Sequence, residues 1–323
     1  KDRRPDLRQY MQALGTLDPA GLPLVSETLD GNFGDPQMYL PVWRRMVKVI
    51  GHTDWLFVGD SKLHSAQNIA EIHRAEGLLL TPLQMNGHMP EHFAEWLRQQ
   101  PKHLTTLTLP DANGSQRRVG HGYEVAHTLT WKDPQSGETV TVPLRVFMVQ
   151  RQSFKEKQIQ DLQRRLERAQ AAVKELNGRR CDTPTEREEL EAQVRGLVAE
   201  HQVADYLSVR LQWQEQQVEK FVGPGRPGPQ RRKQVITHQV AQVSSRRKPA
   251  QIQAYEVAAG WRAYATNAPK ARLTLQQAVE KYAGQWQPER GFGRLKGGWL
   301  KVAPIFLRTD EHIRGLMFIL SIV

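Results

Sequence analysis

Four polar side chains near the end of the chain recur at a spacing that suits one face of a helix. They are Tyr282, Gln285, Glu289 and Lys296. At about 100° per residue, they lie within about 60° of one another around a helix axis. A stripe of phenol, amide, carboxylate and ammonium groups is not a core face. The plain alternative is a solvated helix face, and the spacing alone favours that alternative.

A second candidate for chemistry is Asp60, which directly follows the apolar run 55–59. A short apolar run without alternation predicts a strand that is buried on both faces. In open α/β sheets, ligands bind at the carboxyl ends of the strands, where Asp60 is expected to lie. Its carboxylate oxygens suit a divalent cation. A turn or capping aspartate is the alternative interpretation.

The elements that must position these residues alternate between strands and helices. A helix is expected from Asp35, which can cap it, to Gly51, and another over 65–76. A further helix opens at Thr274, where Gln277 completes a capping box. Strand, helix and strand over 55–83 predict an α/β core with a partly parallel sheet. Strands are predicted at 7–16, 22–29, 55–60, 78–83, 104–109, 123–131, 140–149 and 261–266.

The middle of the chain has a different pattern, beginning at residue 151. Apolar residues spaced alternately three and four apart predict a long helix with a heptad seam. A capping box that begins at Thr183 predicts a second helix that continues to about residue 221. The short connection favours an antiparallel hairpin of the two helices, and dimerisation through the seam is the alternative. The seam residues are Ile159, Leu162, Leu166, Ala169, Val173 and Leu176.

Residues 221–255 contain no acidic side chain, and we interpret them as a basic, partly ordered linker. Within them, Gly225-Arg226-Pro227 resembles an AT-hook core, which inserts into the minor groove of DNA. A plain flexible linker is the alternative. The predicted DNA contacts of this segment are Arg226, Arg231, Arg232 and Lys233.

The composition favours a polyanionic partner and excludes several classes of protein. Lys and Arg number 45 against 34 Asp and Glu, a net charge of +11, which favours DNA or RNA as the partner. The one cysteine, Cys181, excludes a disulfide framework and a cysteine-based zinc site. No apolar run reaches the roughly 18 residues of a membrane span, so no membrane partner is expected. His88 and His92 lack an evident third ligand and are not expected to bind a metal.

The stripe near the end of the chain resembles the signature of a large group of bacterial insertion-sequence transposases. That signature is Tyr, two residues, Arg, three residues, Glu, six residues and Lys. The chain matches it at Tyr282, Glu289 and Lys296, with Gln285 in place of the Arg. The similarity covers residues 1–85 and 255–323. Its other matching segments are 1–9, 21–32, 58–60, 303–307 and 312–316.

The resemblance implies an α/β, ribonuclease-H-like fold, with a mixed sheet flanked by helices and an insertion before the last catalytic helix. The core is then expected in two parts, residues 1–150 and 256–323. Residues 151–222 are expected to form a coiled-coil helical hairpin insertion. The basic Gly/Pro-containing linker follows at 223–255.

The resemblance also implies metal-dependent DNA chemistry. Three acids of the group hold two Mg²⁺ ions, with Mn²⁺ as an alternative metal. The ions activate water to nick DNA and then activate the freed 3′ hydroxyl to attack a target. Asp60 corresponds to the second acid and Glu289 to the third, whereas the first is expected upstream of Lys1, so this fragment is expected to be inactive. The implied DNA contacts near the cut are Tyr282, Gln285, Arg290, Arg294 and Lys296.

The expected partner is double-stranded DNA, both the element ends and the target, in the bacterial cytoplasm at the nucleoid, with a homodimer as a further expectation. The alternative function is a non-enzymatic basic DNA-binding protein that dimerises through a coiled coil at 151–221. The two hypotheses differ in what they require of Asp60 and Glu289. A shared metal site requires these carboxylates to face each other, whereas the alternative does not.

Overall fold

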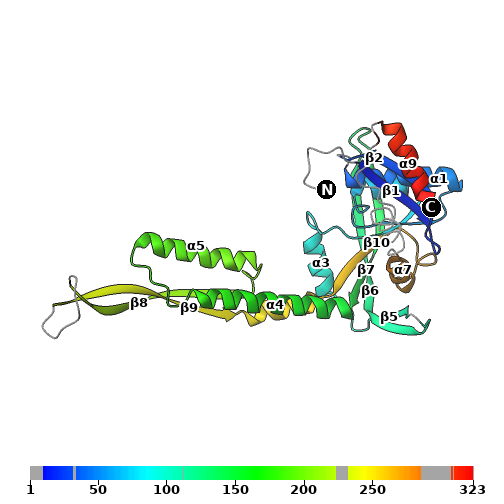
Figure 1. Ribbon diagram of the computed structural model, residues 1–323. Helices are drawn as coiled ribbons and strands as arrows, with labels where there is room; N and C mark the ends of the chain where they lie inside the picture. The colour runs from blue at the N-terminus through cyan, green and yellow to red at the C-terminus, as the bar shows by residue number, and fades with distance from the viewer. Residues whose placement is uncertain are drawn as a thin grey trace. The chain divides into compact units, whose positions relative to one another are not determined.

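The computed structural model describes residues 10–31, 34–111, 113–222, 232–284, 307 and 309–322. The chain divides into two compact units, which Figure 1 shows. Unit 1 comprises Lys1–Arg151 and Trp261–Val323, and unit 2 comprises Gln152–Gly260. Unit 2 is therefore an insertion into the sequence of unit 1.

Unit 1 begins with an antiparallel hairpin of β1 (Tyr10–Leu17) and β2 (Leu22–Asp30), which confirms both predicted strands. The turn between them places Gly21 at φ 66°, a left-handed conformation that favours glycine. A short 3₁₀ helix, η1 (Asp35–Met38), then leads into α1 (Tyr39–Ile50). The predicted helix is present, but Gly34 occupies the N-cap position that we assigned to Asp35.

Unit 1 contains a mixed six-stranded sheet in the order β3-β4-β10-β7-β6-β5. Strands β3 and β4 are parallel, as the strand-helix-strand pattern predicts, and every other neighbouring pair is antiparallel. The strands are β3 (Leu56–Val58), β4 (Leu78–Pro82), β5 (Thr105–Pro110), β6 (Gln116–Lys132), β7 (Thr139–Arg151) and β10 (Trp261–Thr266).

Helices cover both faces of this sheet. One face packs with α1, α2 (Ala66–Arg74) and α3 (Met89–Arg98) in a single apolar cluster, to which the sheet contributes Phe57 and Leu79. The opposite face packs against α7 (Leu275–Ala283), whose capping box of Thr274 and Gln277 is present as predicted. The last helix, α9 (Asp310–Ile322), lies beside β2. Unit 1 is thus an α/β structure compatible with a ribonuclease-H-like fold.

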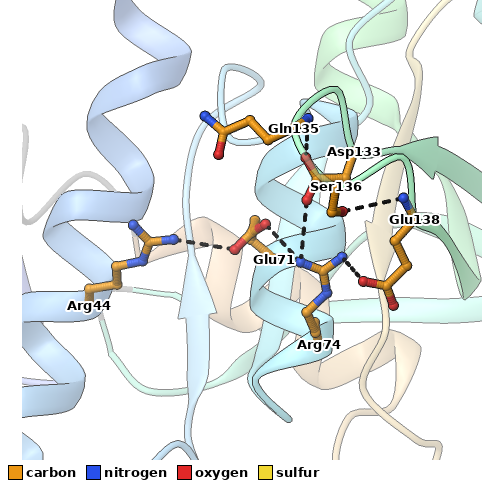
Figure 2. A network of polar contacts seen from close by, with 7 residues as sticks. All are labelled: Arg44, Glu71, Arg74, Asp133, Gln135, Ser136 and Glu138. Atoms are coloured by element: carbon orange, nitrogen blue, oxygen red, sulfur yellow. Dashed lines mark hydrogen bonds and ion pairs between the residues drawn. The ribbon is translucent and has the colours of Figure 1, made fainter.

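A network of charged side chains ties the helical layer to the turn between β6 and β7, as Figure 2 shows. Arg74 of α2 forms ion pairs with Glu71 at 3.3 Å and with Glu138 at 3.0 Å. Arg44 of α1 reaches the other oxygen of Glu71 at 3.2 Å. The backbone N–H of Gln135 donates to Asp133 within the turn, and this bond lowers the pKa of the Asp133 carboxyl. The network therefore connects α1 and α2 with the turn between β6 and β7, which is more than 50 residues later in the sequence.

Unit 2 contains two helices, a long two-stranded ribbon and a short helix. The helices are α4 (Gln152–Glu175) and α5 (Pro184–Glu200), and the capping box at Thr183 is present as predicted. The ribbon pairs β8 (Leu207–Phe221) with β9 (Lys233–Arg247) in antiparallel register. The short helix, α6 (Pro249–Ala258), closes the unit.

Two expectations for this unit were wrong. The second helix ends at Glu200, so that 207–221 is a strand, and much of the expected linker 223–255 is β9 and α6. The physical reason is that Leu207 and Leu211 satisfy both periodicities. Together with Val209 and Trp213 they place an apolar residue at every second position from 207 to 213. Only a strand can bury such an alternation on one face.

The heptad seam of α4 is present, but it does not form a coiled coil with a second helix. Leu162, Leu166 and Ala169 are fully buried, and they pack with Val203 and Leu207. Residues of α6 complete the same cluster. Other parts of unit 2 fill most of the seam, and its last residue, Leu176, packs with Leu190 and Val194 of α5. The structure therefore does not show the expected coiled-coil hairpin. No helix of the described residues is long and apolar enough to cross a membrane.

Candidate active site

The candidate site is built around the turn that follows β3. Strand β3 ends at Val58, and Gly59 then brings the chain close to its neighbours. A Cβ at Gly59 would lie 2.8 Å from Leu63 Cδ2 and 3.0 Å from Tyr39 Cε1. Only glycine fits this approach without a shift of those side chains. The tight turn presents Asp60 at the carboxyl end of the parallel strand pair.

The Asp60 carboxylate is oriented by two donors that bond to one of its oxygens. The hydroxyl of Tyr39 donates to Oδ1 at 2.7 Å, and the backbone N–H of Lys62 donates to the same oxygen at 2.7 Å. Within the described ranges, Oδ2 has no hydrogen-bond partner, and the side chain is exposed. Asp60 therefore offers one oriented carboxylate oxygen toward solvent.

The backbone of the Asp60 turn is held by strand β4. Thr81, which is fully buried, donates its hydroxyl to the carbonyl oxygen of Asp60 at 2.7 Å. The N–H of Gly59 donates to the carbonyl of Leu80 at 3.1 Å. The turn is thus fixed to the neighbouring strand rather than to other loop residues. Such support from a rigid sheet is what a reactive carboxylate requires.

The side chain of His64 ends the same turn and is buried. The backbone N–H of Gln84 donates to His64 Nδ1 at 3.4 Å, whereas Nε2 is buried with no hydrogen-bond partner in the described structure. Burial lowers the pKa of His64 to about 4, and the nearby His127 adds to the effect. The imidazole is therefore neutral at pH 7 and anchors the turn to the segment after β4.

Helix α7 ends near the sheet edge that carries Asp60. Tyr264 of β10 lies opposite Pro82, the last residue of β4. The ring of Tyr282, in the last turn of α7, packs on the ring of Tyr264 with centroids 4.7 Å apart. The described helix then ends at Ala283. The segment that follows α7 therefore starts from this edge of the sheet.

Two arginines that we did not predict as site residues lie at the same edge. Arg151 is the last residue of β7, and Arg262 is the second residue of β10. Burial raises the pKa of Tyr264, and both guanidinium groups act on its hydroxyl in the opposite direction. Because Arg262 and Tyr264 are two apart on one strand, they share the sheet face that α7 covers. The sequence signal for them was a basic residue at a strand end.

Most of the predicted stripe lies outside the described residues. Of its members, Tyr282 is described, and it is partly buried against the core rather than fully exposed. The stripe beyond α7 and its distance from Asp60 therefore stay predictions. The site residues that lie outside the described ranges are Arg226, Arg231, Gln285, Glu289, Arg290, Arg294 and Lys296.

The remaining predicted DNA contacts lie in unit 2. Arg232 directly precedes β9, and Lys233 is its first residue. The ammonium group of Lys233 forms an ion pair with Glu219 at 2.8 Å and lies over the ring of Phe221. Lys233 thus has intramolecular partners, which reduce its free charge at the end of the ribbon.

The donor atoms at the sheet edge suit a hard metal ion, although they supply few ligands. Asp60 offers a carboxylate oxygen, which is the ligand type that Mg²⁺ prefers. Within the part of the chain that the structure describes, no three His, Cys, Asp or Glu side chains are grouped to hold a metal. The predicted second ligand, Glu289, lies outside that part.

The histidine pair that we set aside as a metal site has other contacts. His88 lies 3.3 Å from Glu91, in an exposed position at the start of α3. His92 stacks on Trp96 and lies beside His127. Packing and local hydrogen bonding therefore account for the positions of both side chains.

Comparison with known proteins does not assign the chain to a family. No protein-family model matches it, and a search of curated proteins gave no match. The transposase resemblance consequently depends on the motifs of the sequence.

Proposed function

We propose that the chain is part of the catalytic core of a DNA transposase with a ribonuclease-H-like fold. The observation that carries this proposal is the position of Asp60. An oriented carboxylate follows the end of a parallel strand, and the helix that leads into Gln285–Lys296 ends near the same sheet edge. The signature motif requires its second and third acids to meet, and these two features support that requirement for Asp60 and the segment that carries Glu289.

The proposed reaction is metal-dependent cleavage of DNA followed by strand transfer. Asp60 and Glu289 would hold Mg²⁺, or Mn²⁺ in its place, in a site for two ions. Bound there, the ions would supply Lewis-acid activation of the attacking oxygen and charge stabilisation of the leaving oxygen. The residues of the chain would orient the DNA: the guanidinium groups of Arg151 and Arg262 lie at the same edge and suit phosphate oxygens.

The charge of the chain supports a DNA partner, which we propose that the chain meets in the bacterial cytoplasm. The net charge of +11 attracts the phosphate backbone over long range. Additional phosphate contacts are proposed for Tyr282, Gln285, Arg290, Arg294 and Lys296. Gln285 stands where the group has Arg, so this position would offer a neutral amide donor instead of a charged, bidentate guanidinium group.

The alternative, a DNA-binding protein that dimerises through a coiled coil, has less support. It requires the seam of α4 to face a second chain. Leu162, Leu166 and Ala169 are instead fully buried against residues of unit 2 itself. Exposing the seam would open this core, and the loss of buried apolar surface would cost several kcal/mol of stability.

Metal binding tests the proposal directly. Mn²⁺ is titrated into the chain by calorimetry, and the titration is repeated with Asp60→Asn and Glu289→Gln. We expect each variant to bind Mn²⁺ at least about tenfold more weakly, because each removes one charged ligand. Asp205→Asn, which removes an exposed acid of unit 2, is the matched control and should bind as the parent chain does.

The opposite pattern would overturn the catalytic proposal. If Asp60→Asn binds Mn²⁺ as tightly as Asp205→Asn does, the Asp60 carboxylate is not a metal ligand. Circular dichroism at the start of each titration checks that the variants are folded. The exposed position of Asp60 makes a folding defect of the isosteric Asn variant small.

A further inference from the structure

The ribbon of unit 2 has two chemically different faces. Strands β8 and β9 pair so that even-numbered residues lie opposite even-numbered residues, as with Ser208 and Arg246 or Gln212 and Gln242. Because side chains alternate along a strand, all even-numbered side chains share one face. All odd-numbered side chains share the other. Figure 1 shows the ribbon alongside α4 and α5.

The odd-numbered face is the one that the rest of unit 2 covers. Leu207 packs with the seam of α4, and Trp213 and Ala241 pack with α5. Both acids of the ribbon, Glu215 and Glu219, are also odd-numbered. Both carboxylates have partners within the ribbon: Gln239 donates to Glu215 at 3.1 Å, and Lys233 forms an ion pair with Glu219.

The even-numbered face contains no Asp or Glu on either strand. Arg210 and Arg246 are exposed, and within the described chain neither has an ion-pair partner. Gln242 of β9 donates to Gln214 of β8 at 2.7 Å, so one amide–amide hydrogen bond joins the two strands on this face. We call this surface the open face, and its exposed members are Ser208, Arg210, Gln212, Gln214, Gln216, Lys220, Gln234, Gln242, Ser244 and Arg246.

The carboxylate of Asp182 lies beside the open face, and it already has hydrogen-bond partners. Residues 178–181 run along β9, where Arg180 forms a bridge with Val240 and Asp182 lies near His238. Asp182 is 2.8 Å from His238 Nδ1 and accepts the backbone N–H of Gln239 at 3.0 Å. The His238 contact, with the nearby Arg180, holds the pKa of Asp182 below its ordinary value. The open face as a whole therefore remains positive.

We propose that the open face docks in the major groove of duplex DNA. A two-stranded β-ribbon fits the width of the B-form major groove. Arginine and glutamine are side chains that hydrogen-bond guanine and adenine edges there, and serine hydroxyls bind phosphates. From Ser208 to Gln216 the face spans about 27 Å at about 3.4 Å per residue, which is less than one turn of DNA. This inference rests on DNA as the partner in the proposed function.

The test compares two double variants of the full chain that remove the same charge. Arg210→Ala with Arg246→Ala removes two cations from the open face. Lys157→Ala with Arg168→Ala removes two exposed cations from α4, on the covered side of the ribbon. Binding of a labelled 30-base-pair duplex is followed by fluorescence anisotropy over a range of salt concentrations.

We expect the open-face variant to bind about tenfold more weakly, or worse, than the α4 variant at the same salt concentration. Its plot of log K against log salt should also be shallower than that of the α4 variant, because the open face loses two positive charges close to the phosphate backbone. Equal affinities and equal slopes for the two double variants would overturn the proposal. Because all four side chains are exposed, thermal unfolding should be the same in both variants.

Two further measurements identify the groove. Methylation of guanine N7, which lies in the major groove, should weaken binding of the parent chain and have little effect on the open-face variant. An RNA duplex of the same sequence should compete poorly, since the major groove of A-form RNA is deep and narrow. Equal competition by RNA would contradict major-groove docking.

Failure of this inference is distinct from failure of the proposed function. The open-face variant retains Asp60, so Mn²⁺ binding that depends on Asp60 should persist in it. If the open-face variant and the α4 variant bind DNA equally well while metal binding is retained, the docking surface alone is refuted. Retained ribbon-dependent DNA binding with no Asp60-dependent metal binding refutes the catalytic proposal alone.

Discussion

The turn that carries Asp60 should lose stability in mild acid, because its last residue is a buried neutral histidine. The pKa of His64 is lowered from 6.5 to about 4, mainly by burial. The folded-state pKa lies below the unfolded-state value, so the unfolded chain binds the additional proton. The contribution of the neutral His64 to the free energy of unfolding of unit 1 should therefore be fully present above about pH 6.5. It should decrease as the pH falls toward 4.

The size of the effect follows from the difference between the two pKa values. At 1.36 kcal/mol per pH unit, a difference between 6.5 and about 4 corresponds to about 3 kcal/mol. Burial lowers the pKa of His127 as well, and this contributes in the same direction. His64→Gln cannot be protonated, so the variant should keep only the shallower dependence that His127 and the acids produce.

Urea unfolding at several pH values between 7 and 4.5 measures this dependence. Tryptophan fluorescence reports mainly on unit 1, because Trp213 is the one tryptophan of unit 2. His88→Gln is the control, since the side chain of His88 is 87% exposed. The reasoning is wrong if the parent chain and His64→Gln lose stability in parallel between pH 6.5 and 4.5.

Three substitutions test the packing described above, each by urea unfolding. Gly59→Ala places a Cβ 2.8 Å from Leu63 and should destabilise unit 1 by about 1–3 kcal/mol, whereas unchanged stability would mean that the turn moves freely. Arg74→Ala should cost only about 1 kcal/mol, since the Arg74 side chain is 36% exposed, and a loss above about 3 kcal/mol would contradict the screened network. Leu166→Ala should destabilise unit 2 by about 2–5 kcal/mol, and a neutral result would show that the seam is not a core.

The elements of unit 1 were predictable because local signals and tertiary burial agree. The apolar runs at 56–58 and 78–82 have no alternation, and both strands are covered by helices on two faces. The helix that begins after Thr274 carries its own capping box. By contrast, the strand order could not be predicted. It depends on pairings such as Trp261 with Gln150, which lie across the whole insertion.

The errors in unit 2 arose where one pattern satisfied two structures. Leu207 and Leu211 fit a helix face and a strand face equally well, and the choice was decided by pairing with β9, the next strand of the chain. The absence of acids from 221–255 was interpreted as a linker. The structure gives another reason for part of it, since β9 leaves one polar face uncovered.

Asp60 was predictable as a site residue, and its supporting residues were not. A carboxylate after a buried run is a local feature, whereas the Tyr39 hydroxyl reaches it from a helix 21 positions earlier. Thr81 and Arg262 lie on strands that only the sheet register brings to the same edge. Such support comes from tertiary pairing, which a pattern within one segment does not contain.

The insertion point of unit 2 has a consequence for how such chains diverge. The unit leaves the sheet after Arg151 and returns at Trp261, on two strands that are hydrogen-bonded to each other. Its two ends are thus about one strand spacing apart, roughly 5 Å, so a tight turn could replace the whole unit without opening the sheet. Closely spaced chain ends are what allows one domain to be inserted into another. Distant homologues should therefore be sought as two conserved blocks whose separation in sequence is left free.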